Sequence, residues 1–272
     1  MAGLRASSRA GCMNLVILTA EDRLYLPAFF QRFLAKRARD TRAIFSCPLR
    51  YGKESTLDTL RKYRRAFGWG NTLKLACKEA HARLSDRLGR GRSGGRCYSI
   101  RAAAARYGIP YETAEDVNAE SFRARLREME TDLIVSVTCP QIFKKPLIET
   151  PRIACLNMHG ALLPKYRGIA PSFWMMAHGE SQAGVTVFRV NEAIDLGDVI
   201  EVESFPILAD ETLEQFIIRS KAIACDVLLR AIDQIESGTA AYRPLTKEGG
   251  SYFGFPDRAA YHKFLAQGRR LW

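Results

Sequence analysis

The sequence predicts an α/β fold, with an open, twisted and mostly parallel sheet flanked by helices. Short apolar runs typical of buried strands alternate with longer segments that have the apolar spacing of helices. The first such unit is a strand over residues 15–18, a helix opened by Pro27 and a second strand over 43–45. Strand–helix–strand units build parallel sheets. The chain has 272 residues, and 47% of them are hydrophobic, which is enough to bury a core of this kind.

The later elements follow the same alternation. A long helix over 212–237 has Asp210 or Glu211 near its amino-terminal cap and Gly238 just past its end. We therefore expect one domain over 13–238, preceded by a disordered leader over 1–12 and followed by a short C-terminal extension over 239–272. The other predicted strands are 133–137, 154–158, 185–190 and 199–205, and the other predicted helices are 100–107, 121–129 and 172–178.

A basic segment over 48–100 interrupts this alternation. It holds thirteen Lys or Arg residues against four Asp or Glu residues, a net charge of +9. Two amphipathic helices, over 56–67 and 72–88, are predicted to join through Gly68, and a flexible basic loop follows over 89–96. We interpret the segment as a helical insertion. It is either a solvated face packed on the sheet by its leucines, or a surface that binds an acceptor or another anionic partner.

The composition of the chain indicates which partners, metal sites and membrane segments to expect. The net charge of +12 favours anionic partners. Seven cysteines without C-x-x-C spacing indicate reduced thiols in a cytoplasmic protein, and the four scattered histidines predict no metal site. No run of eighteen apolar residues occurs, so we expect no transmembrane segment. Peripheral membrane contact and a homodimer stay open.

Three polar residues form the candidate site. Asn157 and His159 end a predicted strand, and residues i and i+2 of a strand point to the same side. They should face one cavity at the carboxyl edge of the sheet, where α/β folds bind ligands. Asp195 lies in a later turn. An amide and an imidazole can donate hydrogen bonds to an oxyanion, and a carboxylate can orient the imidazole or accept a proton. This set suits direct attack of an amine on an acyl carbon.

The residues around this site resemble a known family. Residues 157–171 read Asn-Met-His-Gly-Ala-Leu-Leu-Pro-Lys-Tyr-Arg-Gly-Ile-Ala-Pro, and the likeness continues in order through 178–180, 183–187 and 195–197. This pattern is similar to that of the folate-dependent formyltransferases, which include methionyl-tRNA formyltransferase, glycinamide ribonucleotide formyltransferase and the sugar N-formyltransferases. Ala161 departs from it, since the family commonly has serine there. The likeness is absent over 48–100.

The resemblance implies a fold, a chemistry and a co-substrate. It implies the Rossmann-like formyltransferase fold, 10-formyltetrahydrofolate as the formyl donor and a cytoplasmic enzyme of one-carbon metabolism. The three residues Asn157, His159 and Asp195 would form the catalytic group. The implied folate-binding residues are Gln141, Ile142, Phe143, Leu162, Leu163 and Pro164.

The acceptor is the least determined part of the prediction. We expect a phosphorylated small-molecule amine, an amino sugar on a nucleotide or lipid carrier, because a basic insertion suits phosphates. Only 239–272 follow the long helix, too few residues for the β-barrel domain of roughly a hundred residues that helps the tRNA enzymes to grip tRNA. The basic segment also interleaves few aromatic residues, which disfavours nucleic acid. Two alternatives stay open: an enzyme like methionyl-tRNA formyltransferase that acts on aminoacyl-tRNA, and a catalytically silent binding module of the same fold.

Overall fold

The computed structural model describes residues 13–48, 56–90 and 95–272. The expected leader over 1–12, the start of the basic insertion over 49–55 and part of its loop over 91–94 lie outside these ranges. Across the described residues, no helix is both long enough and apolar enough to cross a membrane.

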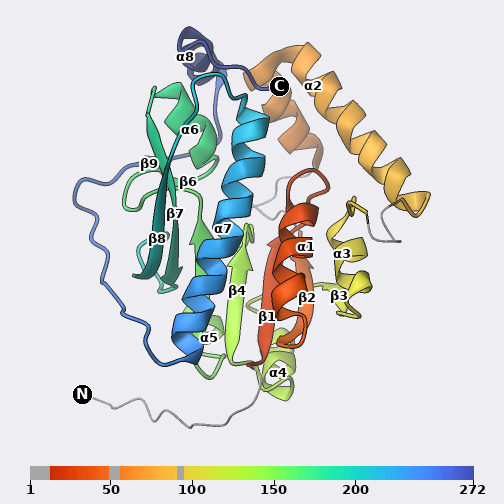
Figure 1. The fold of residues 1–272 in the computed structure, drawn as a ribbon, viewed down its shortest axis with the longest axis vertical. Helices are drawn as coiled ribbons and strands as arrows, with labels where there is room; N and C mark the ends of the chain where they lie inside the picture. Colours follow the sequence, from red (N-terminus) through yellow and green to blue (C-terminus); the bar gives the residue numbers. More distant parts are fainter. Residues whose placement is uncertain (1–12, 49–55, 91–94) are drawn as a thin grey trace.

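The described residues form a seven-stranded sheet in the order β3-β2-β1-β4-β5-β7-β8 (Figure 1). The first five strands in this order pair in parallel, whereas β7 is antiparallel to β5 and β8 is antiparallel to β7. The predicted mostly parallel sheet is therefore confirmed. The strands are β1 Leu15–Ala20, β2 Thr41–Cys47, β3 Tyr111–Thr113, β4 Leu133–Val137, β5 Ala154–His159, β7 Gln182–Arg189 and β8 Asp198–Pro206.

Helices cover both faces of this sheet, which explains why its central strands are apolar throughout. In β1, Leu15 and Ile17 pack into the larger core with α1 and α7, while Val16 and Leu18 pack into a second core with α4. All four side chains are fully buried. The covering helices are α1 Leu26–Arg37, α3 Ile100–Arg106, α4 Glu120–Glu128, the short α5 Lys145–Ile148, α6 Pro171–Ala177 and α7 Leu213–Glu236.

Helix α7 begins one residue later than its sequence predicts, because Thr212 is its cap. The Thr212 hydroxyl accepts the Gln215 backbone N–H at 3.2 Å, and the Gln215 side chain accepts the Thr212 N–H at 2.9 Å. This reciprocal pair satisfies two of the helix's free N–H groups. Glu211, expected near the cap, instead accepts the Leu208 N–H at 2.8 Å. Gly238 ends the helix in the left-handed region, with φ +71°.

The two predicted helices of the basic insertion form α2 Thr56–Arg87, which is broken at Gly68. Gly68 has φ +83°, a backbone conformation that glycine adopts at little cost. The break takes one residue, so the second half starts at Trp69 and not at Thr72 as predicted. Figure 1 shows α2 projecting along one side of the molecule, away from the sheet.

The C-terminal extension packs back onto the rest of the fold. Strand β9 Tyr252–Phe253 pairs in parallel with β6 Arg167–Gly168, and helix α8 Arg258–Ala266 contacts α2 and α6. Phe264 and Leu271 are buried in the larger core. The sequence patterns predicted none of these three elements.

Candidate active site

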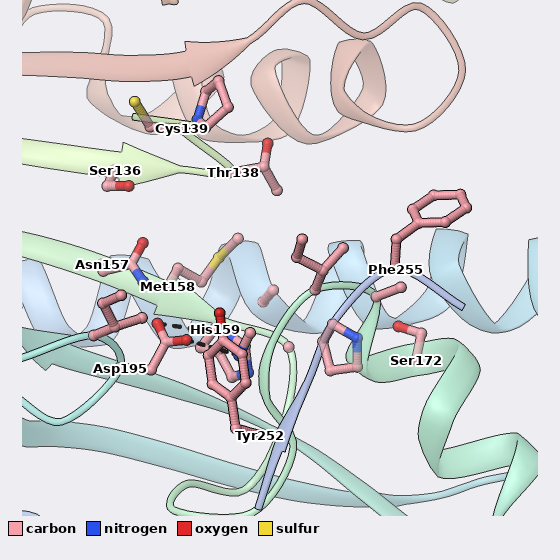
Figure 2. A pocket seen from close by; sticks show the side chains of 18 of the residues that line it. Ser136, Thr138, Cys139, Asn157, Met158, His159, Ser172, Asp195, Tyr252 and Phe255 are labelled. Atoms are coloured by element: carbon pink, nitrogen blue, oxygen red, sulfur yellow. Dashed lines mark hydrogen bonds and ion pairs between the residues drawn. The ribbon is translucent and has the colours of Figure 1, made fainter. Parts of the chain in front are cut away.

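A cavity of about 600 Å³ opens at the carboxyl ends of β4 and β5. Its walls come from the segment after β4, the end of β5, the turn before β8, one face of α7, the inner part of α2 and the C-terminal extension. Figure 2 shows Asn157 and His159 on β5, with Asp195 beside His159. The strand alternation therefore places both β5 side chains at one cavity, as predicted, and the turn adds the carboxylate.

Asn157 is held by its backbone and has its side chain free. It lies between Ser136 of β4 and Phe188 of β7, so hydrogen bonds of the sheet fix its position from both sides. Its half-buried amide lines the cavity and makes no hydrogen bond to any residue that the structure describes. The amide N–H₂ group is thus available to a ligand.

His159 is buried and oriented by a backbone contact. Its Nε2 lies 2.7 Å from the carbonyl oxygen of Tyr166. A carbonyl only accepts hydrogen bonds, so Nε2 carries a proton. The neutral ring then has its lone pair on Nδ1, which lies 4.0 Å from the Asp195 Oδ1. Nδ1 of this tautomer can accept a hydrogen bond, and it can donate one only when the ring is protonated.

Asp195 is fixed by a backbone hydrogen bond. Its Oδ2 accepts the Gly168 N–H at 2.9 Å, and Asp195 itself lies in the left-handed region with φ +52°. Gly168 also has a positive φ, +92°, and a Cβ atom added there would lie 2.3 Å from the Phe253 carbonyl oxygen. Only glycine fits between Asp195 and β9, so the carboxylate and the C-terminal extension are positioned together.

The predicted folate residues after β4 line the cavity in different ways. Ile142 is 61% exposed, whereas Phe143 is buried in the second core. The Gln141 side chain is occupied: it accepts the Val117 N–H and donates to the Glu115 carbonyl, both at 3.0 Å. This segment therefore offers a ligand the Ile142 side chain and backbone groups, and not the amide of Gln141.

The other three predicted folate residues, Leu162, Leu163 and Pro164, are not among the residues that line the cavity, and their contact with folate stays a prediction. Leu162 packs on Gly184 of β7, the Leu163 N–H bonds to the Thr186 hydroxyl at 3.2 Å, and the Pro164 carbonyl accepts the Ser251 N–H at 3.2 Å. The loop folds over β7 and the C-terminal extension. Its role in this geometry is to place the Tyr166 carbonyl that holds His159.

The comparison with known families agrees with this geometry. The family model described as "Formyl transferase" matches residues 93–232, which include Asn157, His159 and Asp195. The match covers more than half of the chain. The chain belongs to the formyl transferase family.

Curated relatives of this chain include tRNA enzymes. Methionyl-tRNA formyltransferase from Geobacter metallireducens is 30% identical over 183 residues, covering 64% of this chain and 59% of that protein. The corresponding enzyme from Syntrophus aciditrophicus is 34% identical over 153 residues, covering 56% of this chain and 49% of that protein. The chain thus spans about half the length of the curated relatives that it matches.

Solved structures of other formyl transferases share the fold. A sugar N-formyltransferase from Shewanella has a TM-score of 0.56 at 19% identity and covers 94% of this chain and 87% of its own. Glycinamide ribonucleotide transformylase 1 from Symbiobacterium toebii has a TM-score of 0.57 at 17% identity, over 88% of this chain and 96% of its own. At these identities the likeness shows the fold alone.

Part of the cavity wall was not predicted from sequence. Tyr63 and Phe67 come from α2, and Tyr252 and Phe255 come from the C-terminal extension. The clustering of aromatic residues after 250 is a sequence signal for such a role, although it does not say which surface they cover.

The sequence patterns also did not predict that Lys221 lines the cavity. It lies on the face of α7 that Ile217, Ser220 and Ala224 share, and this face lines the cavity. Lys221 has no hydrogen bond or ion pair with the described residues, and burial lowers its pKa. A lysine on an otherwise apolar or small-residue helix face is visible in the sequence at i, i+3 and i+4 spacing. Within the described residues, no group of three or more His, Cys, Asp or Glu side chains is arranged to hold a metal.

Proposed function

We propose that the protein is an N-formyltransferase that moves a formyl group from 10-formyltetrahydrofolate to a primary amine. The observation that carries the proposal is the free polar set at one cavity. Among the residues that the structure describes, the amide of Asn157 has no hydrogen-bond partner and the Nδ1 of His159 accepts no hydrogen bond, and the Asp195 carboxylate lies 4.0 Å from that nitrogen. A purely structural Asn–His–Asp group would be expected to satisfy its own hydrogen bonds.

The proposed chemistry uses each group once. The amine nitrogen attacks the formyl carbon, a new C–N bond forms, and the formyl oxygen becomes an oxyanion. Asn157 donates to this oxygen, and His159, protonated at Nδ1 and stabilised by Asp195, donates as well. Collapse of the intermediate restores the carbonyl and breaks the bond to the folate nitrogen. That nitrogen leaves with a proton released by the attacking amine, passed through His159 or water.

The folate would bind between two segments that face each other across the cavity. One is the segment after β4 with Ile142, and the other is the turn over 190–195, and residues of both line the cavity. Ile142 offers exposed apolar surface to a pterin, and its neighbours offer backbone donors and acceptors. The Helicobacter canadensis N-formyltransferase, which has the same fold with a TM-score of 0.57, was solved in complex with folinic acid and dTDP-3-aminofucose.

For the acceptor, we propose an amino sugar that carries a phosphate on a nucleotide or lipid carrier. Tyr63, Phe67 and Phe255 line the cavity together, with the Phe67 ring 4.6 Å from that of Tyr63 and 6.2 Å from that of Phe255, and Lys221, which has no ion pair with the described residues, lines the same cavity. Aromatic side chains stack on sugar or base rings, and a lysine without a partner suits a phosphate. The six described cysteines are free thiols, which supports a cytoplasmic enzyme.

The test is formyl transfer from 10-formyltetrahydrofolate to a panel of purified amines, with nucleotide-linked amino sugars, glycinamide ribonucleotide and methionyl-tRNA included. Asn157→Ala and His159→Ala should each lower turnover by at least about a hundredfold, as expected when an oxyanion donor is lost. His262→Ala, at an exposed histidine of α8, is the matched control. Near wild-type turnover in either cavity variant would contradict the assignment, and folate binding without transfer to any amine would favour the silent binding module.

Methionyl-tRNA is the second candidate acceptor, because the curated relatives at 30% and 34% identity are methionyl-tRNA formyltransferases. The same panel separates the two candidates. A kcat/KM for methionyl-tRNA above that for every amino sugar would favour the tRNA acceptor, and it would leave the catalytic group unchanged.

A further inference from the structure

The outer half of α2 carries a stripe of exposed apolar side chains, which we call the α2 stripe. Successive members are three or four residues apart, so they lie on one side of the helix. Four large members are far more exposed than apolar side chains usually are: Trp69 at 71%, Leu73 at 66%, Leu84 at 57% and Leu88, just past the helix end, at 59%. Cys77 and Ala80 are also exposed and fill the gap between Leu73 and Leu84.

The opposite side of the same helix already has its partner. Thr72, Ala82 and Ser85 are buried there. Lys78 pairs with Glu214 of α7, across the interface between the two helices. The α2 stripe is therefore a second apolar surface, which the packing of the domain does not use.

The charges around the α2 stripe have one sign. Arg83, Arg87 and Arg90 are exposed, and Arg83 has only a long 3.9 Å contact to Glu79. The acidic residues between 69 and 90 are Glu79 and Asp86, and both are partly buried, whereas the exposed charged residues of this range are basic. Asp86 accepts the Ser99 hydroxyl at 2.9 Å and pairs with Arg23 at 3.3 Å. Burial raises the pKa of Glu79, which fits an inward position.

We propose that the α2 stripe docks the protein on an anionic lipid bilayer. The leucines and Trp69 would enter the boundary between headgroups and acyl chains, and the arginines would meet the lipid phosphates. A helix with an apolar side and a basic border binds such surfaces through buried apolar area and charge attraction together. The projecting position of α2 in Figure 1 leaves the helix accessible to a flat surface. The proposal does not depend on which amine is formylated.

Charge distinguishes a bilayer from the other candidate partners. A second copy of the chain packed on the α2 stripe would bring the Arg83 and Arg87 rows of both copies together, and like charges repel. A nucleic acid would engage the arginines but would leave three leucines facing a polar backbone. An anionic bilayer satisfies both the apolar side chains and the cations.

The test is vesicle flotation with the full chain. Vesicles of phosphatidylcholine alone are compared with vesicles that also contain phosphatidylglycerol. The wild-type protein should float with the anionic vesicles and much less with the neutral ones. Leu73→Glu/Leu84→Glu should weaken this binding by about tenfold or more, because two buried apolar groups become charged. Arg83→Gln/Arg87→Gln should weaken it on anionic vesicles while the leucines remain.

The matched control is Leu208→Glu/Ile218→Glu. It makes the same change in charge at side chains that are 50% and 49% exposed and lie outside α2, one before α7 and one on α7. Circular dichroism and thermal denaturation establish that each variant is folded. Equal flotation of the control and the Leu73→Glu/Leu84→Glu variant would overturn the proposal. Failure of the wild-type protein to float with anionic vesicles, together with salt-sensitive binding of tRNA, would also overturn it. A dimer that light scattering shows to be lost only in the Leu73→Glu/Leu84→Glu variant would do the same.

Discussion

A single backbone contact determines how His159 can work. The Tyr166 carbonyl at 2.7 Å keeps the proton on Nε2, so Nδ1 is the nitrogen left for the substrate. Nδ1 lies 4.0 Å from the Asp195 Oδ1. We therefore expect the two residues to act together, with the carboxylate facing the nitrogen that gives or takes a proton.

We predict that Asp195→Asn lowers kcat by about ten- to a hundredfold, the range expected when one charged hydrogen-bond partner is lost. The Asn carbonyl can still accept the Gly168 N–H, so the loop should keep its position. Its N–H₂ group would then face Nδ1 and could not stabilise an imidazolium. Steady-state kinetics and fluorescence titration of folate measure the two effects. A collapse of folate affinity at unchanged kcat would make Asp195 a binding residue instead.

Lys221 has a cost in stability, and we predict that it also binds the acceptor. Burial lowers its pKa, so the folded protein holds this proton less tightly than the unfolded chain does. The charge therefore destabilises the fold at neutral pH, and the penalty disappears as pH rises toward the ordinary lysine pKa of about 10.4. An anionic acceptor would restore a partner to the charge.

Lys221→Met should accordingly raise Tm at neutral pH, with a smaller gain at alkaline pH. It should raise acceptor KM by about tenfold, the loss expected for one charge-assisted contact, and leave folate KM unchanged. Lys247→Met, at an exposed lysine, is the control and should change neither quantity. Thermal denaturation at two pH values and steady-state kinetics provide the measurements. An acceptor KM within about twofold of wild type would show that Lys221 does not contact the acceptor.

At the scale of elements, the pairing of β6 with β9 joins the catalytic loop to the C-terminal extension. The Ile169 N–H bonds to the Phe253 carbonyl at 2.8 Å, and the Arg167 N–H bonds to the Ser251 carbonyl at 3.0 Å. Gly168 lies between these bonds and donates to Asp195. The small sheet therefore positions both the carboxylate and Tyr252.

Gly168→Ala should separate these two strands. The added Cβ would lie 2.3 Å from the Phe253 carbonyl oxygen, and φ +92° is unfavourable for alanine, so the loop must move. We expect a loss of roughly 1–3 kcal/mol of stability and a fall in kcat, because Asp195 loses its donor. Gly108→Ala is a control with a similar φ, +68°, and open space around its Cβ. Denaturant unfolding measures the free energy of unfolding, and steady-state kinetics measure kcat. Equal values of both quantities in Gly168→Ala and Gly108→Ala would contradict this prediction.

Elements with a strong local pattern were predictable, and elements made by distant pairing were not. Strand β4 has the predicted bounds of 133–137, because helices cover both of its faces and its whole run is apolar. Strand β9 has two residues and exists only through β6, with the Tyr166–Ser251 contact spanning 85 positions. Neither length nor periodicity marks such a strand in the sequence. The four-residue α5 is equally invisible to helical periodicity.

At the scale of the whole molecule, the cavity has two halves with different origins. Asn157, His159 and Asp195 lie inside the family match over 93–232, and strand alternation with the motif resemblance could place them. The aromatic wall comes from Tyr63 and Phe67 before that region and from Tyr252 and Phe255 after it. Because the wall depends on how α2 and the extension fold onto the sheet, the sequence could predict the three polar residues of the cavity but not the aromatic residues beside them.

The late position of β9 in the chain has a consequence for biosynthesis. Tyr252 is joined to the growing polypeptide 93 residues after His159. At roughly 5–20 residues per second, this is a delay of about 5–20 s. All seven strands of the main sheet precede residue 207, so translation supplies the sheet and the three polar groups before it supplies the partner of β6. A ribosome that stalls in this interval holds a chain that has Asn157, His159 and Asp195 but lacks Tyr252 and Phe255 of the cavity wall.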